Sequence, residues 1–187
     1  MSPFDVPNGI YLIDPVRSVI GFSVRHALVL DVRGRFTSFE GILKLNGRHF
    51  SRNAAYMSIQ TESLDTRDRE KDRHLKGPDF FHSSSFPLMT FQSAGIAGAG
   101  DEGVRLDGDL RIKDVELPVT LDLEFGGAAR DARGRHRVGF RGTATLGQSD
   151  RGLVWSAPPQ SGGAPVDVEM SLAVDISAVH MDPENGP

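Results

Sequence analysis

Cysteine is missing from this chain of 187 residues. Its absence excludes disulfides, thiol nucleophiles and cysteine-ligated metal sites. Other patterns that accompany catalysis are missing too: there is no H-E-x-x-H, no His-x-His in a strand-like segment and no serine in G-x-S-x-G. The glycine-rich stretch at 98–103 is not followed by the Lys-Ser or Lys-Thr of a phosphate loop. We therefore expect no metal and no cofactor, and no residue stands out as catalytic.

Long apolar runs and an excess of basic charge are also absent. The longest apolar runs, such as ALVL at 27–30, are far shorter than the ~18 residues that a membrane span requires. The N-terminus has neither the basic nor the apolar region of a signal peptide, so we expect a cytoplasmic protein. With 21 basic and 25 acidic residues the net charge is −4, which gives no support for nucleic-acid binding.

What the sequence does contain is alternation of apolar and polar residues. In VTLDLEF (119–125) every second residue is apolar, and VRLDGDLRI (104–112) and VDVEMSLAVDI (166–176) follow the same pattern. Such alternation is typical of antiparallel strands with one buried face and one face in water. Further strands are expected near 10–13, 17–26, 31–45, 54–63, 87–96 and 135–147. The glycine-rich stretches 95–103 and 126–134 are expected to be hairpin connections.

Eight or nine strands of this kind predict an all-β sandwich or barrel. Because the strands are long and one-sided, a single closed sheet is favoured, an antiparallel up-and-down barrel of about eight strands. A barrel of that size can hold one small ligand in its interior. We expect one domain over 10–178, between flexible ends at 1–9 and 179–187.

One segment, RDREKDRHLKGPDFFHSSSFP (67–87), does not look like a strand. It predicts a short helix that begins near Arg67, is capped by Thr66 or Asp65, and ends at Gly77–Pro78. The charges of 67–73 are expected to face water. Three apolar side chains follow as the helix ends, and we expect this helical insert (67–82) to drive them into one mouth of the barrel as a plug; they are Leu75, Phe80 and Phe81.

The chain also resembles a known family in the order of its motifs. These are YLIDPVRSVIGFSVRH, GRFTSFEGIL, SIQTESLDTRDREKDRHLKGPDFFHSSSFPLMTFQS and LDGDLRIKDVELPVTLDLEF, spread over about 10–177. They are similar to the YceI-like family, bacterial lipid-binding proteins with a lipocalin-like barrel. The resemblance implies an elongated barrel that encloses a polyisoprenoid or a similar amphiphilic chain.

Alternation also predicts which side chains face the barrel interior. Within this set His26 continues an apolar stripe, which leaves three roles open: a hydrogen-bonded core histidine, a contact to the polar group of a ligand, or an acid–base catalyst. The long Pro/Gly-rich loop at 148–165 carries the single tryptophan, Trp155, either as part of a lid or as a surface residue. The side chains expected to line a ligand tunnel are Phe22, Val24, His26, Phe36, Met57, Ile59, Met89, Phe91, Leu110, Leu121 and Phe140.

Together these features predict a protein that carries or sequesters a long-chain lipid without catalysis. Two alternatives remain open at this stage. The first is an enzyme that modifies such a lipid with His26 as the acid–base group. The second is a small-molecule binder whose barrel is largely filled by its own phenylalanine and methionine side chains. The expected partner is the lipid itself, with no nucleic acid, and a homodimer is one option for the oligomeric state.

Overall fold

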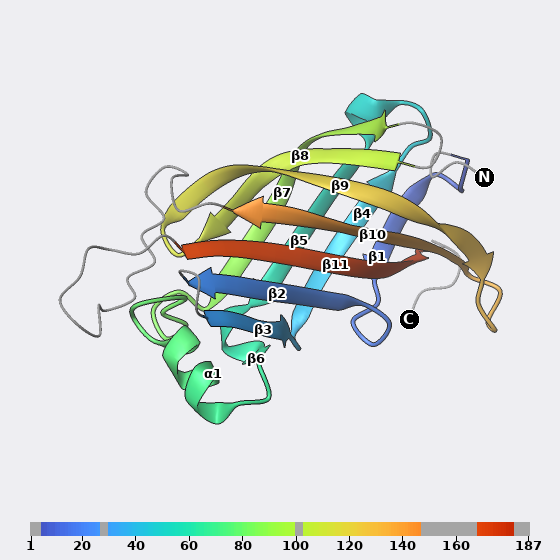
Figure 1. Ribbon diagram of the computed structural model, residues 1–187. Coiled ribbons are helices and arrows are strands. Elements are labelled where there is room, and N and C mark those ends of the chain that lie inside the picture. The colour runs from blue at the N-terminus through green and yellow to red at the C-terminus, as the bar shows by residue number, and fades with distance from the viewer. Residues whose placement is uncertain (1–4, 27–29, 100–102, 147–167, 182–187) are drawn as a thin grey trace.

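The computed structural model describes residues 5–26, 30–99, 103–146 and 168–181 (Figure 1). Antiparallel strands make up most of it, with one α-helix, α1 (Arg69–Lys76), and two short 3-10 turns, η2 (Phe50–Arg52) and η3 (Thr61–Ser63). The strands are β1 (Gly9–Ile13), β2 (Val19–His26), β3 (Leu30–Phe36), β4 (Phe39–Leu45), β5 (Ala54–Gln60), β6 (Leu64–Asp65), β7 (Leu88–Ala99), β8 (Gly103–Ile112), β9 (Val115–Arg130), β10 (His136–Leu146) and β11 (Val168–His180).

The sheet closes on itself as a barrel. Neighbouring strands follow the order β1-β4-β5-β7-β8-β9-β10-β11, and β1 pairs back with β11, which gives a ring of eight. β2 takes over from β1 as the partner of β11 along the barrel, β3 pairs with β2, and the short β6 pairs with β3. The expected up-and-down antiparallel barrel is therefore confirmed.

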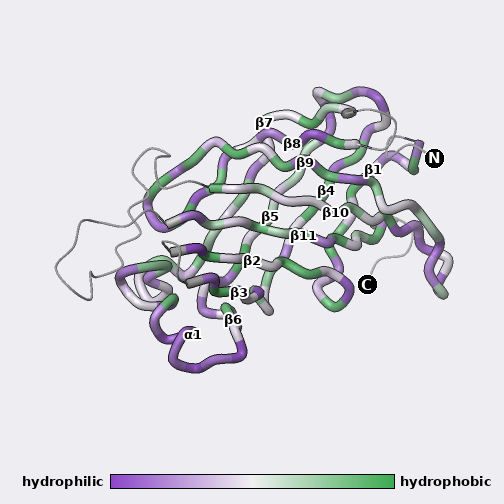
Figure 2. Tube along the Cα trace, in the orientation of Figure 1, coloured by the Kyte–Doolittle hydropathy of each residue, from purple (hydrophilic) through white to green (hydrophobic). Residues whose placement is uncertain are grey.

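The burial pattern confirms the expected register. Along β8 buried and exposed residues alternate from end to end, as the sequence pattern predicts. Phe22 and Phe91 are both buried. A slip of one residue would have moved each of them to the outer face. Figure 2 shows the same alternation as changes of colour along the strands, whereas α1 is mostly hydrophilic.

Both glycine-rich stretches differ from their predicted role as hairpin connections. β7 continues through Gly95 to Ala99, and β9 continues through Gly127 to Arg130. Gly95 lies opposite Asp107 and Gly127 opposite Gly139 in the ladder, so backbone pairing keeps the chain extended at both glycines. The register shifts beside these glycines, as it does at β-bulges. The β9–β10 turn itself falls at 131–135.

Other boundaries also differ from the expected ones. The predicted strand 31–45 is broken at Thr37, whose N–H donates to the Ser63 carbonyl, so it forms β3 and β4. The segment 54–63 ends as a strand at Gln60 and continues as η3. At the C-terminus β11 extends to His180, and the N–H of Met181 donates to the Ile10 carbonyl.

The helical insert forms where the sequence predicts it, with a different cap. Asp68 caps α1, because its carboxylate accepts from the N–H groups of Glu70 and Lys71. Thr66 donates its hydroxyl to the Asp72 carboxylate, and Asp65 accepts from the N–H of Arg67. The side chains of the two predicted caps thus bond to Arg67 and Asp72, whereas the N–H groups of the first helical turn are capped by Asp68. The helix ends at Gly77, as expected. No helix in the described ranges has the length and apolar character needed to cross a membrane.

Candidate ligand-binding cavity

The insert closes one end of the barrel. Leu75, Phe80 and Phe81 are buried, with 3%, 4% and 1% of their surfaces exposed. The Phe81 ring lies with its centroid 5.6 Å from that of Phe36 and 6.3 Å from that of Phe22, both in edge-on contact. Such aromatic pairs add about 0.5–1.5 kcal/mol each beyond their buried area. The expected burial of the three plug residues is confirmed.

The start of the insert is held by β6, which pairs with β3. Beyond α1, the charge of Asp79 acts on Lys113 in the β8–β9 turn. Burial lowers the pKa of Lys113 in that turn, while the charges of Asp114 and Asp79 act in the opposite direction.

Four of the residues predicted to line a tunnel belong to this packed end instead. Phe22, Val24, Phe36 and Met89 are buried but do not line the cavity described below. This corrects the expectation of a tunnel along the whole barrel, because the Phe22, Phe36 and Phe81 rings pack against one another there. The plug residues lie in the same packed end and likewise do not line the cavity.

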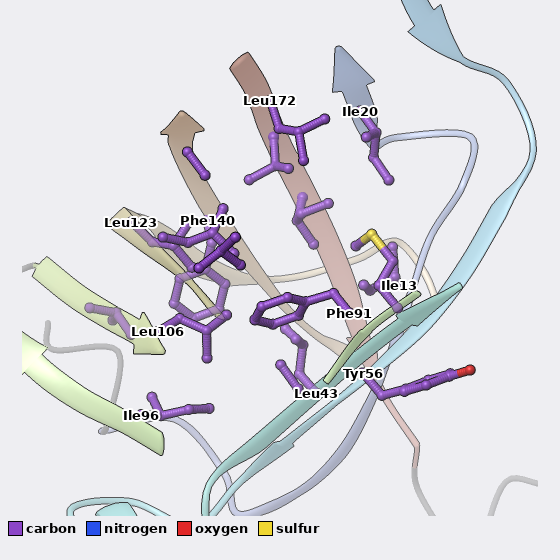
Figure 3. A pocket seen from close by; sticks show the side chains of 18 of the residues that line it. Ile13, Ile20, Leu43, Tyr56, Phe91, Ile96, Leu106, Leu123, Phe140 and Leu172 are labelled. Atoms are coloured by element: carbon purple, nitrogen blue, oxygen red, sulfur yellow. The ribbon is translucent and has the colours of Figure 1, made fainter. Parts of the chain in front are cut away.

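The rest of the barrel contains a cavity of about 100 Å³ (Figure 3). It extends from mid-barrel toward the end that carries the β9–β10 turn, away from α1. Every lining side chain is aliphatic or aromatic, apart from the thioether of Met57 and the hydroxyl of Tyr56. Figure 3 shows the Phe91 and Phe140 rings reaching inward from opposite walls. The predicted residues that line the cavity are Met57, Ile59, Phe91, Leu110, Leu121 and Phe140.

Gly108 makes room for one of these rings. It faces inward on β8 beside Phe91 on β7. A Cβ atom at Gly108 would lie 2.5 Å from the Cζ atom of Phe91, so only glycine lets the ring lie flat against this wall.

More than half of the lining residues were not among those predicted. Apart from the exposed Ala54 and Tyr56, they share the inward face of strands whose alternation is plain in the sequence, so their burial could be predicted. Nothing in the alternation itself indicates which half of the barrel is hollow. These residues are Ile13, Ile20, Leu43, Leu45, Ala54, Ala55, Tyr56, Ile96, Val104, Leu106, Val119, Leu123, Ala144, Leu172, Val174 and Ile176.

A seam between β5 and β7 borders the cavity. Ladder pairing between these strands ends at Tyr56 and Gln92. Beyond that point the N–H of Ala55 donates to the Ser93 side-chain oxygen, 2.8 Å away, in place of a backbone carbonyl. Ala54 and Tyr56 line the cavity and are exposed as well. In Figure 3 the Tyr56 ring points away from the other labelled side chains, toward the outside.

Charged groups gather beyond the cavity, where β1, β10 and β11 meet. Arg137 donates to Asp14 at 2.8 Å and to the Ser177 hydroxyl at 2.9 Å, and lies 3.7 Å from Asp131. Burial would raise the pKa of Asp14, but hydrogen bonds from Arg137, the Val16 N–H and the Arg17 side chain outweigh it and lower that pKa. Nearby, burial raises the pKa of Tyr11 to about 12. None of these charged groups lines the cavity.

Two candidate residues lie wholly or partly outside the described part of the chain. Trp155 belongs to 147–167, so the proposed lid is outside that part. His26 is the last residue of β2, where its backbone pairs with Val168 and Leu30, and its side chain lies outside the described part of the structure. Within the described ranges, histidine, aspartate and glutamate form no cluster of three that could hold a metal ion.

A closed antiparallel barrel with one packed end and an internal cavity is the architecture of a binding barrel. The YceI-like domain profile matches residues 11–178, so the chain belongs to the YceI-like family. A UPF0312 protein of Vibrio cholerae is 30% identical over 175 residues, which cover 92% of this chain and 89% of that protein.

Solved structures share the fold at lower identity. A Campylobacter jejuni YceI protein superposes with a TM-score of 0.69 at 23% identity, over 84% of this chain and 90% of its own. A polyisoprenoid-binding domain from Saccharophagus degradans, implicated in plant cell wall breakdown, gives a TM-score of 0.59 at 12% identity, over 94% of this chain and 100% of its own. At these identities the likeness concerns the fold alone.

Proposed function

We propose that this protein binds a long-chain amphiphilic lipid of the polyisoprenoid type inside the barrel, and carries or sequesters it without changing it chemically. The observation that carries the proposal is the cavity, whose lining is apolar throughout. Such a lining offers an isoprenoid chain dispersion contacts and removal from water, and it offers a reacting group no charged side chain.

The size of the cavity favours a slender ligand. Its volume of about 100 Å³ is below the ~300–1,000 Å³ of pockets for compact drug-sized molecules. A single extended chain suits such a space better than a fused ring system. The half-buried Leu43, Met57 and Leu123 border the cavity and can adjust to the width of a chain, Met57 most readily because it is unbranched.

The energetics support binding of a long chain. Each CH₂ group moved out of water contributes about 0.8 kcal/mol. Ordering the chain and losing its translational freedom cost several kcal/mol. Many carbons must therefore be buried for tight binding, so a long tail is favoured over a short one, and the half-buried lining residues must move to admit it. The polyisoprenoid-binding domain of S. degradans, which shares the fold, makes an isoprenoid the first ligand to test.

Filling the cavity tests the proposal. Ala144 is buried on β10 and lines the cavity, whereas Ala173 is exposed on the neighbouring β11. Ala144→Phe projects a ring into the cavity, and Ala173→Phe places the same ring in water. We expect Ala144→Phe to reduce uptake of a fluorescent polyprenyl phosphate analogue by about tenfold or more, since the ring displaces several buried CH₂ groups of the chain.

The control Ala173→Phe should bind like the parent protein. Circular dichroism should give both variants the spectrum of the parent. A folded Ala144→Phe that takes up the analogue as well as the parent would contradict binding in this cavity. Equal losses from both substitutions would contradict it too.

A further inference from the structure

An apolar row crosses the outer face of the barrel beside the seam. Leu12 on β1 pairs with Ile42 on β4, and Ile42 pairs with Tyr56 on β5. Their exposed fractions are 43%, 41% and 41%. Single exposed apolar residues are common, but adjoining ones on neighbouring strands indicate a contact surface. The row ends at Tyr56, which also lines the cavity, so this outer surface is continuous with the seam.

Basic residues border the same surface. Between Glu40 and Glu62 the chain has no acidic residue, and it carries the cations Lys44, Arg48 and Arg52. Lys44 is exposed on β4 directly opposite Ala54, the other exposed lining residue of the seam.

The 3-10 turn η2 brings two more cations and an aromatic ring to this place. Arg48 and Arg52 flank Phe50 and are exposed, with Arg48 4.0 Å from the exposed Asp5, and 39% of the Phe50 surface is exposed. η2 lies against β7, the second strand of the seam, as Figure 1 also shows. The turn therefore lies beside the second strand of the seam.

We propose that this surface docks on an anionic lipid membrane, with the seam between β5 and β7 facing the bilayer. The inference rests on the proposed lipid-binding function and names the partner from which the lipid is taken or to which it is delivered. Aromatic and aliphatic side chains lie at the level of the lipid headgroups, and the basic residues are held by the negative surface potential. A lipid chain then passes between bilayer and cavity without crossing open water.

The charges favour a membrane over a second copy of the chain. A two-fold interface places the same patch of both copies face to face. Lys44, Arg48 and Arg52 of one copy would then lie near those of the other, and like charges oppose association. The chain as a whole carries a net charge of −4, so this basic surface also orients the molecule when it approaches an anionic membrane.

Vesicle flotation tests the proposal with the full-length protein. The probes are vesicles of phosphatidylcholine alone and vesicles of equal parts phosphatidylcholine and phosphatidylglycerol. We expect the protein to float with the anionic vesicles only, and less so as salt is raised. The charge reversal Arg48→Glu/Arg52→Glu and, separately, Phe50→Ser should weaken flotation by about tenfold or more and by several-fold, respectively.

Matched controls place the same changes elsewhere on the surface. Arg111→Glu/Arg141→Glu reverses two exposed charges on β8 and β10, and Leu88→Ser removes an apolar side chain that is 47% exposed at the start of β7. Both controls should float like the parent protein. Equal losses from controls and test variants would overturn the proposal, as would failure of the parent to bind anionic vesicles.

Two other results have distinct meanings. A concentration-dependent dimer in sedimentation that Phe50→Ser dissociates would assign the surface to a second copy and overturn membrane docking. Native mass spectrometry reports separately on the proposed function. A protein that carries a lipid but does not bind anionic vesicles would contradict membrane docking and leave the lipid-binding function standing. A protein that floats as expected but neither carries nor takes up lipid contradicts the lipid-binding function while the docking surface stands.

Discussion

At the scale of single residues, Phe81 lies at the centre of the closed end. Its ring contacts the Phe22 and Phe36 rings, and 1% of its surface is exposed. Charged side chains of the preceding helix α1, such as Glu70, are exposed. The stability of this end should therefore depend on the aromatic residue and hardly on the charges.

We expect Phe81→Ala to lower the free energy of unfolding by about 3–5 kcal/mol, the range for a buried phenylalanine that leaves a cavity. Glu70→Lys on the exposed face of α1 should lower the free energy of unfolding by less than about 1 kcal/mol, since exposed charges near the start of a helix contribute little. Urea denaturation of both variants measures the difference. Equal losses from the two substitutions would contradict the plug.

At the scale of elements, three separate parts of the chain meet at Arg137. It joins Asp14, which follows β1, to Asp131 in the β9–β10 turn and to Ser177 on β11. The side chains of Asp14, Asp131 and Arg137 are each about 15% exposed, so solvent screens these pairs less than it screens surface pairs. The network holds the end of the barrel opposite α1.

This network predicts a pH dependence of stability. The folded protein lowers the pKa of Asp14 below its unfolded value of about 3.9. Its contribution is therefore present at neutral pH and is lost as the pH falls through the lowered pKa. Asp14→Asn should cost about 1–3 kcal/mol at neutral pH, because hydrogen bonds to a charged group are removed. The difference from the parent should shrink below about pH 4.

Urea denaturation at a series of pH values measures this effect. The control is Asp175→Asn, which removes the exposed carboxylate paired with Arg141 and should change stability little at any pH. A deficit of Asp14→Asn that stayed constant down to pH 2 would show that the charge of Asp14 does not contribute.

The sequence predicts elements better than it predicts their ends. Strand alternation depends on local pattern, so the barrel and its register could be predicted. The continuation of β7 through Gly95 and of β9 through Gly127 could not, because the pairing with the next strand keeps the chain extended although glycine by residue type favours a turn. The helix cap at Asp68 was missed because Thr66 and Asp65 are equally good caps by residue type. Their side chains bond instead to the Arg67 N–H and to the Asp72 carboxylate.

At the scale of the whole molecule, the barrel has a packed half and a hollow half. All inward residues were expected to line one tunnel, yet Phe22 and Phe36 fill the packed half while Phe91 and Phe140 border the cavity. Residue type cannot distinguish these pairs. The position of the insert distinguishes them, because its Phe81 ring contacts the Phe22 and Phe36 rings. That long-range contact fills one half of the barrel, and the cavity lies in the other half.

The most direct test of the account is native mass spectrometry of freshly purified protein, followed by solvent extraction and identification of what is released. We expect one long-chain isoprenoid-type lipid per protein molecule, chemically unaltered, and the same lipid at lower occupancy from His26→Ala. That result would make His26 a residue that positions the ligand. An empty protein that also fails to take up a polyprenyl phosphate analogue would contradict the account. So would a lipid that is chemically altered when His26 is present and unaltered when it is replaced.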